Sequence, residues 1–376
     1  MHHPWTRREF LEMTGTAMLA SALYPFSTAA EQPVASSRAT GLYRQAFVLD
    51  CNTLASIGEL CCEKSTPTQL QAVRESGLTA LKSTLGGGNG TFEAAVGDIA
   101  AADALIERFP QLFIKVRGYG DLDRAKSENK VAVIYSFEAA SMLEGKVERI
   151  GVFRNLGVRV MQLSYNHESP FGYGCLDGET GGVSEPGRKA IAKMNAIGVA
   201  LDLSHANTKT TADGIAISKK PALITHAGCR AVFMHPRNKR DEEMKALADR
   251  GGVMGIYMLP FLTPDNRQPH LDDYMQHMVH ALKVCGEDHV GIGTDSMFFT
   301  VTDKDLQQIK VEVAERSKAG IGAPGENRPP YLPDINTPRK LEYVTDALLR
   351  HGYSERVTDK VLGLNFRRAF KEIWVA

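Results

Sequence analysis

Four side chains that can bind metals or move protons follow short apolar runs in this sequence. They are Glu138 after VAVIYSF (131–137), His205 after VALDLS (199–204), His226 after ALIT (222–225) and Asp295 after HVGIGT (289–294). Imidazoles and carboxylates suit a borderline metal ion such as zinc, and a catalytic zinc site keeps one position open for water. One such histidine alone is more often an ordinary hydrogen-bonded side chain. Four such residues at the same end of successive strands favour a metal site.

The apolar runs are typical of parallel strands that are buried on both faces. Eight of them recur from residue 46 onward: AFVLD (46–50), LTALKST (78–84), VAVIYSF (131–137), VRVMQLS (158–164), VALDLS (199–204), ALIT (222–225), VMGIYML (253–259) and HVGIGT (289–294). Helical stretches usually separate them. Eight such units predict an α/β protein with a (β/α)8 TIM barrel over residues 41–376, whose catalytic groups sit at the C-terminal ends of the strands.

A doubly wound open sheet is the structural alternative, because a count of strands does not prove that the sheet closes. The usual nucleotide-binding form of that fold lacks support, since no G-x-G-x-x-G or G-x-x-x-x-G-K-[ST] motif follows any of the strands. The sequence indicates no second domain and no repeat beyond the alternation of strands and helices.

The segment SEPGRKAIAKMNAIG illustrates the predicted crossover helices. It starts with Ser184, has Pro186 near its first turn and stops at Gly198, and its apolar residues recur every three positions. Two segments rich in Gly and Pro, 167–187 and 320–338, interrupt the pattern. We expect them to form loops over the mouth of the barrel, and we expect the tail after them to form helices that close the domain.

The overall composition favours a globular protein that acts on small molecules. The chain has 376 residues, of which 43% are hydrophobic, so it can bury a sizeable core. Lys plus Arg and Asp plus Glu number 44 each. The chain therefore lacks the cationic footprint that nucleic acid or an anionic membrane would need, and we expect no nucleic-acid partner.

Residues 1–30 have the features of a twin-arginine signal peptide. Arg7 and Arg8 precede a mildly apolar stretch, and small residues follow in STAAEQ, so cleavage is predicted after Ala30. No later segment has about 18 uninterrupted apolar residues, which argues against a stable membrane anchor. We therefore expect export by the twin-arginine machinery, to the periplasm or otherwise outside the cytoplasm.

The six cysteines do not form a recognisable zinc or redox motif. They stand at positions 51, 61, 62, 175, 229 and 285, without a C-x-x-C pair or a finger spacing. An oxidising compartment would permit a disulfide, whereas buried free thiols are at least as well supported, and the sequence does not choose between the two.

Several longer motifs resemble the membrane (renal) dipeptidase family of metallopeptidases, M19, a branch of the amidohydrolase-like barrels. The resemblance is carried by GRKAIAKMNAIGVALDLSHAN, PALITHAGCRAVFMHPRNKRDEEMKALADRGGVMGI, DHVGIGTDS and VLGLNFRRAF. These motifs occur in the family order with similar spacing, and the resemblance covers roughly residues 43–376. It implies a metal-dependent dipeptidase barrel, and it also implies a homodimer, since members of this family often pair.

The resemblance assigns a role to each strand-end residue. Glu138 resembles the carboxylate that bridges two zinc ions, and His205 and His226 resemble the remaining ligands of the second zinc. Arg237, in HPRN, resembles the arginine that binds the substrate carboxylate, which its planar fork of donors suits. Asp295 resembles the catalytic aspartate that handles a proton. The plainer alternatives are a surface arginine at a helix start and an aspartate that caps the helix after the last strand.

The chain departs from the family pattern at two places. The family ends its first strand with a His-x-Asp pair that binds the first zinc, but here LDCNTLAS places Asn52 and Leu54 there. After the fourth strand, where the family has a substrate-polarising histidine, LSYN places Tyr165, with His167 two residues further on. Tyr165 can still donate a hydrogen bond to an oxyanion, and Asn52 offers a neutral polar group to a substrate.

The leading hypothesis is an exported hydrolase of the dipeptidase type. Glu138, His205 and His226 would hold one zinc ion rather than two, and activated water would cleave a dipeptide or a related small amide. The alternative is a dipeptidase-like barrel without peptidase activity, used in natural-product tailoring or small-peptide binding, and the missing His-x-Asp pair motivates it. A purely structural module is the third and weakest hypothesis.

Overall fold

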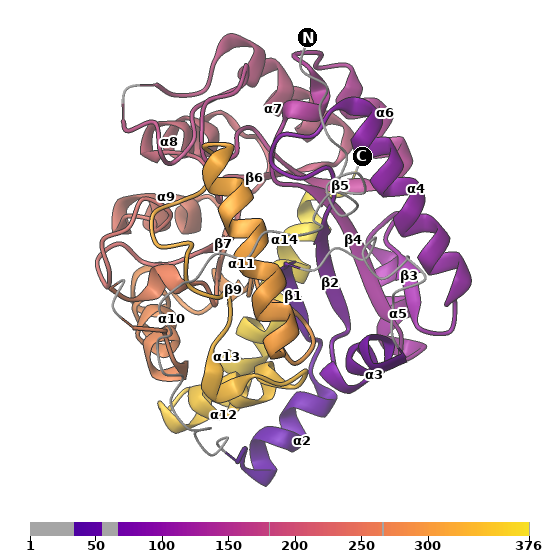
Figure 1. Ribbon diagram of the computed structural model, residues 1–376, viewed down its shortest axis with the longest axis vertical. Coiled ribbons are helices and arrows are strands. Elements are labelled where there is room, and N and C mark those ends of the chain that lie inside the picture. Colours follow the sequence, from indigo (N-terminus) through magenta and orange to yellow (C-terminus); the bar gives the residue numbers. More distant parts are fainter. Residues whose placement is uncertain (1–33, 55–66, 180, 265–266, 376) are drawn as a thin grey trace. The chain divides into compact units, whose positions relative to one another are not determined.

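The computed structural model describes residues 34–375 apart from 55–66, 180 and 265–266. The paired Arg7 and Arg8, with the rest of the predicted signal peptide, lie outside the described residues, and so does the cysteine pair at 61 and 62. The described part of the chain alternates between strands and helices around one parallel sheet (Figure 1).

Every strand pairing in that sheet is parallel. The strands are β1 (Leu49–Thr53), β2 (Ala80–Thr84), β3 (Phe113–Lys115), β4 (Val131–Phe137), β5 (Val158–Gln162), β6 (Ala200–Asp202), β7 (Leu223–Ala227), β8 (Val253–Ile256) and β9 (Val290–Ile292). Eight of them pair in the order β1-β2-β4-β5-β6-β7-β8-β9. The two ends of this row meet, because Thr53 forms a parallel bridge with Ser296 and the Asp295 amide donates to the Asn52 carbonyl at 2.8 Å. The sheet is therefore a nearly closed eight-stranded barrel, which confirms the predicted TIM barrel and rules out the open sheet.

The ninth strand, β3, was not among the eight predicted strands. It pairs only with Val131–Val133 at the start of β4, whereas β5 joins β4 from Tyr135 onward. β3 thus fills the position beside β4 that β5 does not reach. Its three residues are too short a run to give a clear strand pattern in the sequence.

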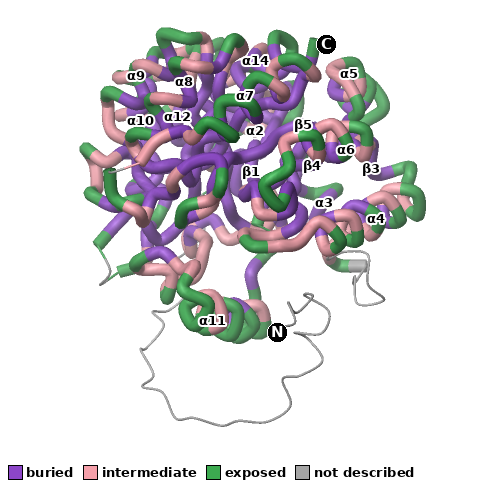
Figure 2. Tube along the Cα trace, turned by 90° about the horizontal axis from the view of Figure 1, so that it is seen from above, coloured by how far each residue is buried: buried purple, intermediate pink, exposed green. Residues whose placement is uncertain are grey.

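The helices lie on the outside of the strands and at the ends of the barrel (Figures 1 and 2). The α-helices are α2 (Ser37–Gln45), α3 (Pro67–Ser76), α4 (Phe92–Arg108), α5 (Gly120–Ser127), α6 (Arg149–Leu156), α7 (Glu185–Ile197), α8 (Thr208–Ile217), α9 (Asp241–Asp249), α10 (Leu271–Cys285), α11 (Asp303–Lys318), α12 (Lys340–Arg350), α13 (Glu355–Asp359) and α14 (Asn365–Ile373). Short 3-10 turns occur at Ser141–Leu143, Pro260–Leu262 and Pro333–Ile335, and a π-helical turn, Lys360–Leu364, joins α13 to α14. None of the described helices is long and apolar enough to cross a bilayer.

Helix α7 forms where the sequence predicts it. The Ser184 hydroxyl accepts a hydrogen bond from the Gly187 amide at 3.0 Å, which caps the first turn, and Pro186 occupies that turn. The helix ends at Gly198, whose φ of +68° is the left-handed conformation that glycine adopts without strain. Ile191 and Met194 from this helix are fully buried in the core.

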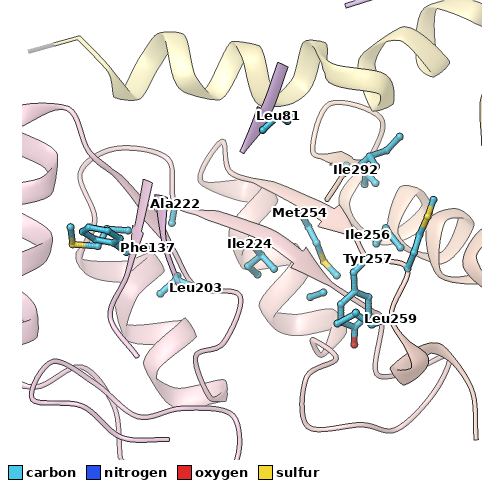
Figure 3. Close-up of a cluster of buried hydrophobic side chains, with 14 of the residues drawn as sticks. Leu81, Phe137, Leu203, Ala222, Ile224, Met254, Ile256, Tyr257, Leu259 and Ile292 are labelled. Carbon is cyan, nitrogen blue, oxygen red and sulfur yellow. The ribbon is translucent and has the colours of Figure 1, made fainter. Parts of the chain in front are cut away.

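Two apolar clusters hold the barrel together. The larger one lies between the strands and the surrounding helices, and Figure 3 shows part of it, including Ile224 from β7 and Met254 and Ile256 from β8. The smaller one collects residues from most of the barrel strands, such as Ala80, together with Phe366 from α14. Only the interior of a barrel brings residues of so many strands into one cluster. This cluster therefore fills the barrel interior near the N-terminal ends of the strands, and α14 packs against it there. The site residues lie at the other end, where the strands finish.

His277 in α10 gives the fold a predictable response to acid. Its Nδ1 accepts from the Cys229 amide at 2.8 Å and its Nε2 donates to the Leu262 carbonyl at 3.2 Å, so the folded protein needs the neutral ring. Burial lowers the pKa of His277 from 6.5 to about 4. Between these values the unfolded chain binds more protons than the folded chain, so the stability is complete above about pH 6.5 and falls as the pH drops towards 4.

The expected size of this effect is about 2 kcal/mol of unfolding free energy between pH 7.5 and pH 5. We expect the His277→Gln variant to be less stable than the wild-type protein at pH 7.5. Between pH 7.5 and pH 5 its unfolding free energy should fall by about 2 kcal/mol less than that of the wild-type protein. Urea unfolding of both proteins at the two pH values measures this difference. Equal losses in the two proteins would contradict the assignment.

Candidate metal centre

Three potential ligands converge at the C-terminal end of the barrel. Glu138 follows β4, His205 lies three residues after β6, and His226 is within β7. The Nε2 atoms of the two histidines are 3.1 Å apart, and His205 Nε2 is 3.9 Å from Glu138 Oε2. One ligand atom from each of the three residues fits within 4.8 Å of the others. The structure therefore brings together the three residues that the sequence proposed as metal ligands.

The hydrogen bonds of His205 fix its tautomer. The guanidinium of Arg237 can only donate, and its Nη2 lies 3.1 Å from His205 Nε2, so this nitrogen presents a lone pair. The hydrogen then sits on Nδ1, which donates to Asn166 Oδ1 at 2.7 Å. His205 is thus held in the form that can bind a metal through Nε2.

A second network does the same for His226. The Thr225 hydroxyl donates its single hydrogen to Asp202 Oδ2 at 2.7 Å, so its oxygen accepts from His226 Nδ1 at 2.9 Å. This leaves the Nε2 lone pair of His226 facing that of His205 across 3.1 Å. Two such lone pairs repel each other, and a cation between them removes the repulsion.

The donor set fits a zinc-like ion. Ligands at about 2.0–2.1 Å in a tetrahedral site stand about 3.3 Å from one another, and the observed separations of 3.1 and 3.9 Å bracket that value. Burial, with Arg237 adding to it, holds the pKa of His205 and of His226 well below the ordinary value, so both rings are neutral near pH 7. Two neutral imidazoles and one carboxylate leave a fourth position open for water or substrate.

Asp202 anchors the histidine networks from inside the barrel. Its Oδ1 accepts from the Ser204 amide, the Ser204 hydroxyl and the Thr225 amide, and its Oδ2 accepts from Thr225 and Gln162. A carboxylate with five donors is well satisfied although it is buried. Sequence reasoning missed this residue, but an acidic residue inside the apolar run VALDLS was a signal that could have found it.

Removing the Thr225 hydroxyl is expected to weaken metal binding, because the His226 Nδ1 hydrogen would lose its acceptor. Loss of such an outer partner typically lowers metal affinity about 10- to 100-fold. We expect that loss for Thr225→Val in a zinc competition titration with a chromophoric chelator. The matched control is Thr345→Val, because the Thr345 hydroxyl bonds only within α12, to the Leu341 carbonyl. Wild-type zinc affinity in Thr225→Val would contradict the tautomer assignment.

Asp295 and Asn52 meet at the seam where the barrel closes. Asn52 Nδ2 donates to Glu138 Oε1 at 2.8 Å and to Asp295 Oδ1 at 2.7 Å. Asp295 Oδ2 lies 4.0 Å from His226 Nε2. The backbone of Asp295 has φ +50°, a conformation that few residues other than glycine adopt, which is common where a side chain is aimed for function. Burial and the Glu138 carboxylate raise the pKa of Asp295 to about 7.

Arg237 is almost fully buried beside the histidines. Its Nη1 donates to the Ser204 carbonyl and its Nη2 to His205 Nε2. The guanidinium also lies over the Tyr257 ring, 5.9 Å from the ring centroid. Arg237 is therefore not a surface arginine, and its guanidinium is directed at Nε2 of His205, the atom proposed to bind the metal.

Tyr165 covers the other side of His205. The two rings are stacked, with centroids 4.1 Å apart. The Tyr165 hydroxyl accepts from Arg316 Nη2 at 2.9 Å, and Arg316 is paired with Glu326. This leaves the hydroxyl hydrogen of Tyr165 available to donate. Arg316 comes from α11, a helix that Figure 2 shows to be largely exposed, and no local sequence signal pointed to it.

The other residues that the sequence raised are not among the three clustered ligands. His167 is exposed and pairs with Asp177 at 3.0 Å, and Leu54 is 38% exposed and offers no ligand atom. The four described cysteines, 51, 175, 229 and 285, are buried free thiols. The two segments rich in Gly and Pro do meet, since Leu176 of the first lines a cavity together with residues 320–327 of the second, apart from 321. Next to the first segment, Asn166 Nδ2 donates to the Ile321 carbonyl at 2.8 Å.

A parallel barrel with two histidines and a carboxylate at its C-terminal end is the arrangement of the amidohydrolase-like barrels. The sequence profile of the membrane dipeptidase family, peptidase family M19, matches residues 66–312. The chain therefore belongs to the membrane dipeptidase family, as its motifs indicated.

Individual relatives agree with this assignment. An amidohydrolase from Pseudomonas aeruginosa is 32% identical, and the match covers 89% of this chain and 99% of that one with a TM-score of 0.78. The dipeptidase verJ of Clonostachys rogersoniana is 26% identical over 294 residues, which cover 76% of this chain and 72% of that protein. A metallopeptidase from Rhodobacter sphaeroides, solved with a phosphinate mimic of the dipeptide L-Ala-D-Ala, shares the fold with a TM-score of 0.67 at 20% identity over 87% of this chain and 99% of that one.

Proposed function

We propose that this protein is an exported hydrolase that cleaves a dipeptide or a related small amide with a free carboxylate, using one zinc ion. The observation that carries the proposal is the convergence of two imidazole lone pairs and the Glu138 carboxylate within 4.8 Å, in a chain of the membrane dipeptidase family. A zinc ion bound there would polarise the scissile carbonyl and activate the attacking water.

The protein's own residues then divide the work of substrate binding. Arg237 is buried and always charged, so its guanidinium suits the free carboxylate of a dipeptide and fixes which end of the substrate enters. To do this, Arg237 exchanges its bond to His205 Nε2 for bonds to the substrate. The hydroxyl of Tyr165 donates its free hydrogen to the oxygen on which negative charge develops.

Asp295 is the proposed proton carrier. Its Oδ2 lies 4.0 Å from His226 Nε2, while Oδ1 is held by Asn52. Oδ2 accepts the proton released by the attacking water and returns it to the departing amine. The role of Asn52 as a direct substrate contact stays a prediction. In this structure both of its amide hydrogens are donated to the two carboxylates, so neither is free to bind a substrate.

The cellular part of the proposal rests on the sequence. Arg7, Arg8 and the small residues before Ala30 support export through the twin-arginine machinery and a periplasmic location. A homodimer is the proposed assembly, by analogy with the family. Fractionation of cells that express the full chain, compared with an Arg7→Lys/Arg8→Lys variant, tests the export, and light scattering of the purified protein tests the dimer.

A panel of dipeptides with zinc, manganese or cobalt tests the activity. We expect cleavage of at least one dipeptide by the wild-type protein and none above background by His205→Ala. No cleavage above that control for any peptide would overturn the peptidase proposal. A peptide that binds tightly and returns unchanged would instead favour the alternative function, a dipeptidase-like barrel that binds or tailors small peptides.

A further inference from the structure

One buried amide holds the two carboxylates of the site together. Asn52, at the end of β1, is fully buried and uses both hydrogens of its Nδ2. One goes to Glu138 Oε1 at 2.8 Å and the other to Asp295 Oδ1 at 2.7 Å. The Thr84 hydroxyl donates its single hydrogen to Glu138 Oε1 at 2.7 Å and lies 3.4 Å from Asn52 Oδ1.

The two oxygens of each carboxylate therefore have different partners, and the arrangement is the same in Glu138 and Asp295. In each of them one oxygen is held on Asn52, and the other faces the histidines: Glu138 Oε2 stands 3.9 Å from His205, and Asp295 Oδ2 stands 4.0 Å from His226. The amide lies on one side of the carboxylate pair and the histidine pair on the other. Among the residues that the structure describes, one group of ligand atoms is close enough together to hold a cation, and it lies on the histidine side.

Two carboxylates that meet in a buried place repel each other, and proteins commonly relieve this with a cation between them. Here a neutral amide occupies the bridging position. Positive charge acts on Asp295 from Arg237 and, to a smaller extent, from Lys82. Lys82 is a fully buried residue of β2, and its Nζ donates to Ser136 Oγ at 3.1 Å. Ser136 lies two residues before Glu138, so Lys82 contacts the same stretch of chain that carries this carboxylate.

We infer that Asn52 takes the place of a second cation in this site. Its amide bridges Glu138 and Asp295, limits the centre to one metal ion, and aims the free oxygen of each carboxylate towards the histidines. Asn52 is in this view a positioning residue. The inference rests on the metal site of the proposed function, but it is independent of whether a peptide is cleaved there.

The test converts the amide into a ligand and counts metal ions. Asn52→Asp keeps the size of the side chain and gives the pocket a third carboxylate in place of the bridging hydrogens. We expect Asn52→Asp to bind one more equivalent of zinc or cobalt per chain than the wild-type protein, measured by equilibrium dialysis and elemental analysis. The matched control is Asn195→Asp, which adds a carboxylate in α7, where Asn195 bonds to Ser218. This control is expected to bind the same number of metal ions as the wild-type protein.

Thermal unfolding gives a second measurement that does not need activity. In chelator, Asn52→Asp is expected to melt below the wild-type protein, because three carboxylates then lie together without a cation. Added metal is expected to raise its Tm by more than it raises that of the wild-type protein.

Should Asn52→Asp fail to fold, Asn52→His decides the matter, because it supplies a ligand atom without adding a negative charge. An unchanged metal count in the variant that folds, or two equivalents in the wild-type protein, would overturn the inference. Failure of the proposed function is distinguishable, since it appears as a lack of peptide cleavage while the increment of one metal ion persists.

Discussion

Asp295→Asn is expected to lower kcat for dipeptide cleavage by about 10²- to 10⁴-fold, the usual contribution of a positioned general base or acid. The amide keeps the shape of the side chain and its contact with Asn52, but it cannot take up a proton from water. Because Asp295 is not among the three proposed ligands, the metal content of the variant is expected to stay at the wild-type value. Steady-state kinetics and elemental analysis of the same samples measure the two quantities.

The pH profile separates this role from a merely structural one. Asp295 must be ionised to accept a proton, and burial together with Glu138 raises its pKa to about 7. The activity should therefore rise with pH, and the midpoint should lie at or below about 7 because a bound cation favours the carboxylate. The variant should lose this rising limb. Asp249→Asn, on the exposed end of α9, is the control that should keep both rate and profile. Retention of more than about a tenth of the wild-type rate by Asp295→Asn would refute the assignment.

Arg237→Met is expected to lower kcat/KM for a free dipeptide at least about 100-fold. The substrate carboxylate would lose two charge-assisted hydrogen bonds, each worth about 1.5–3 kcal/mol. Methionine retains an apolar stem of similar length, so the packing beside Tyr257 is largely kept. The wild-type protein should also prefer the free dipeptide to its C-terminal amide, and the variant should lose this preference.

The comparison between the two substrates distinguishes recognition from folding. If Arg237 only held the Ser204 carbonyl and His205 in place, both substrates would suffer equally. Arg240→Met is the matched control, since Arg240 lies three residues away and pairs with Glu179 at the surface. An equal loss on both substrates, or none on the free dipeptide, would contradict carboxylate recognition by Arg237.

The elements that depend on local patterns were predictable from the sequence. Buried parallel strands leave continuous apolar runs, so all eight barrel strands were found, and VAVIYSF matches β4 (Val131–Phe137) without an error at either end. The start and end of α7 follow from a serine cap and a glycine stop, both of which act within one helical turn. β3 was missed because three residues carry no periodicity.

The site was predictable where ligand types follow strands, and not where it depends on distant contacts. Glu138, His205, His226 and Asp295 could be expected to lie close together, as the structure shows, because the ends of parallel strands converge in a barrel. The bridging role of Asn52 depends on two carboxylates 86 and 243 residues away in the sequence. Such long-range hydrogen bonds leave no pattern in a single sequence.

Metal content per chain is the measurement that tests the central claim most directly. The protein is purified without chelators, incubated with zinc, freed of unbound ions and analysed for zinc, beside a His205→Ala/His226→Ala double variant. The account predicts about one equivalent in the wild-type protein and none in the double variant. No zinc in the wild-type protein, or equal zinc in both proteins, would contradict a metal centre built on Glu138, His205 and His226.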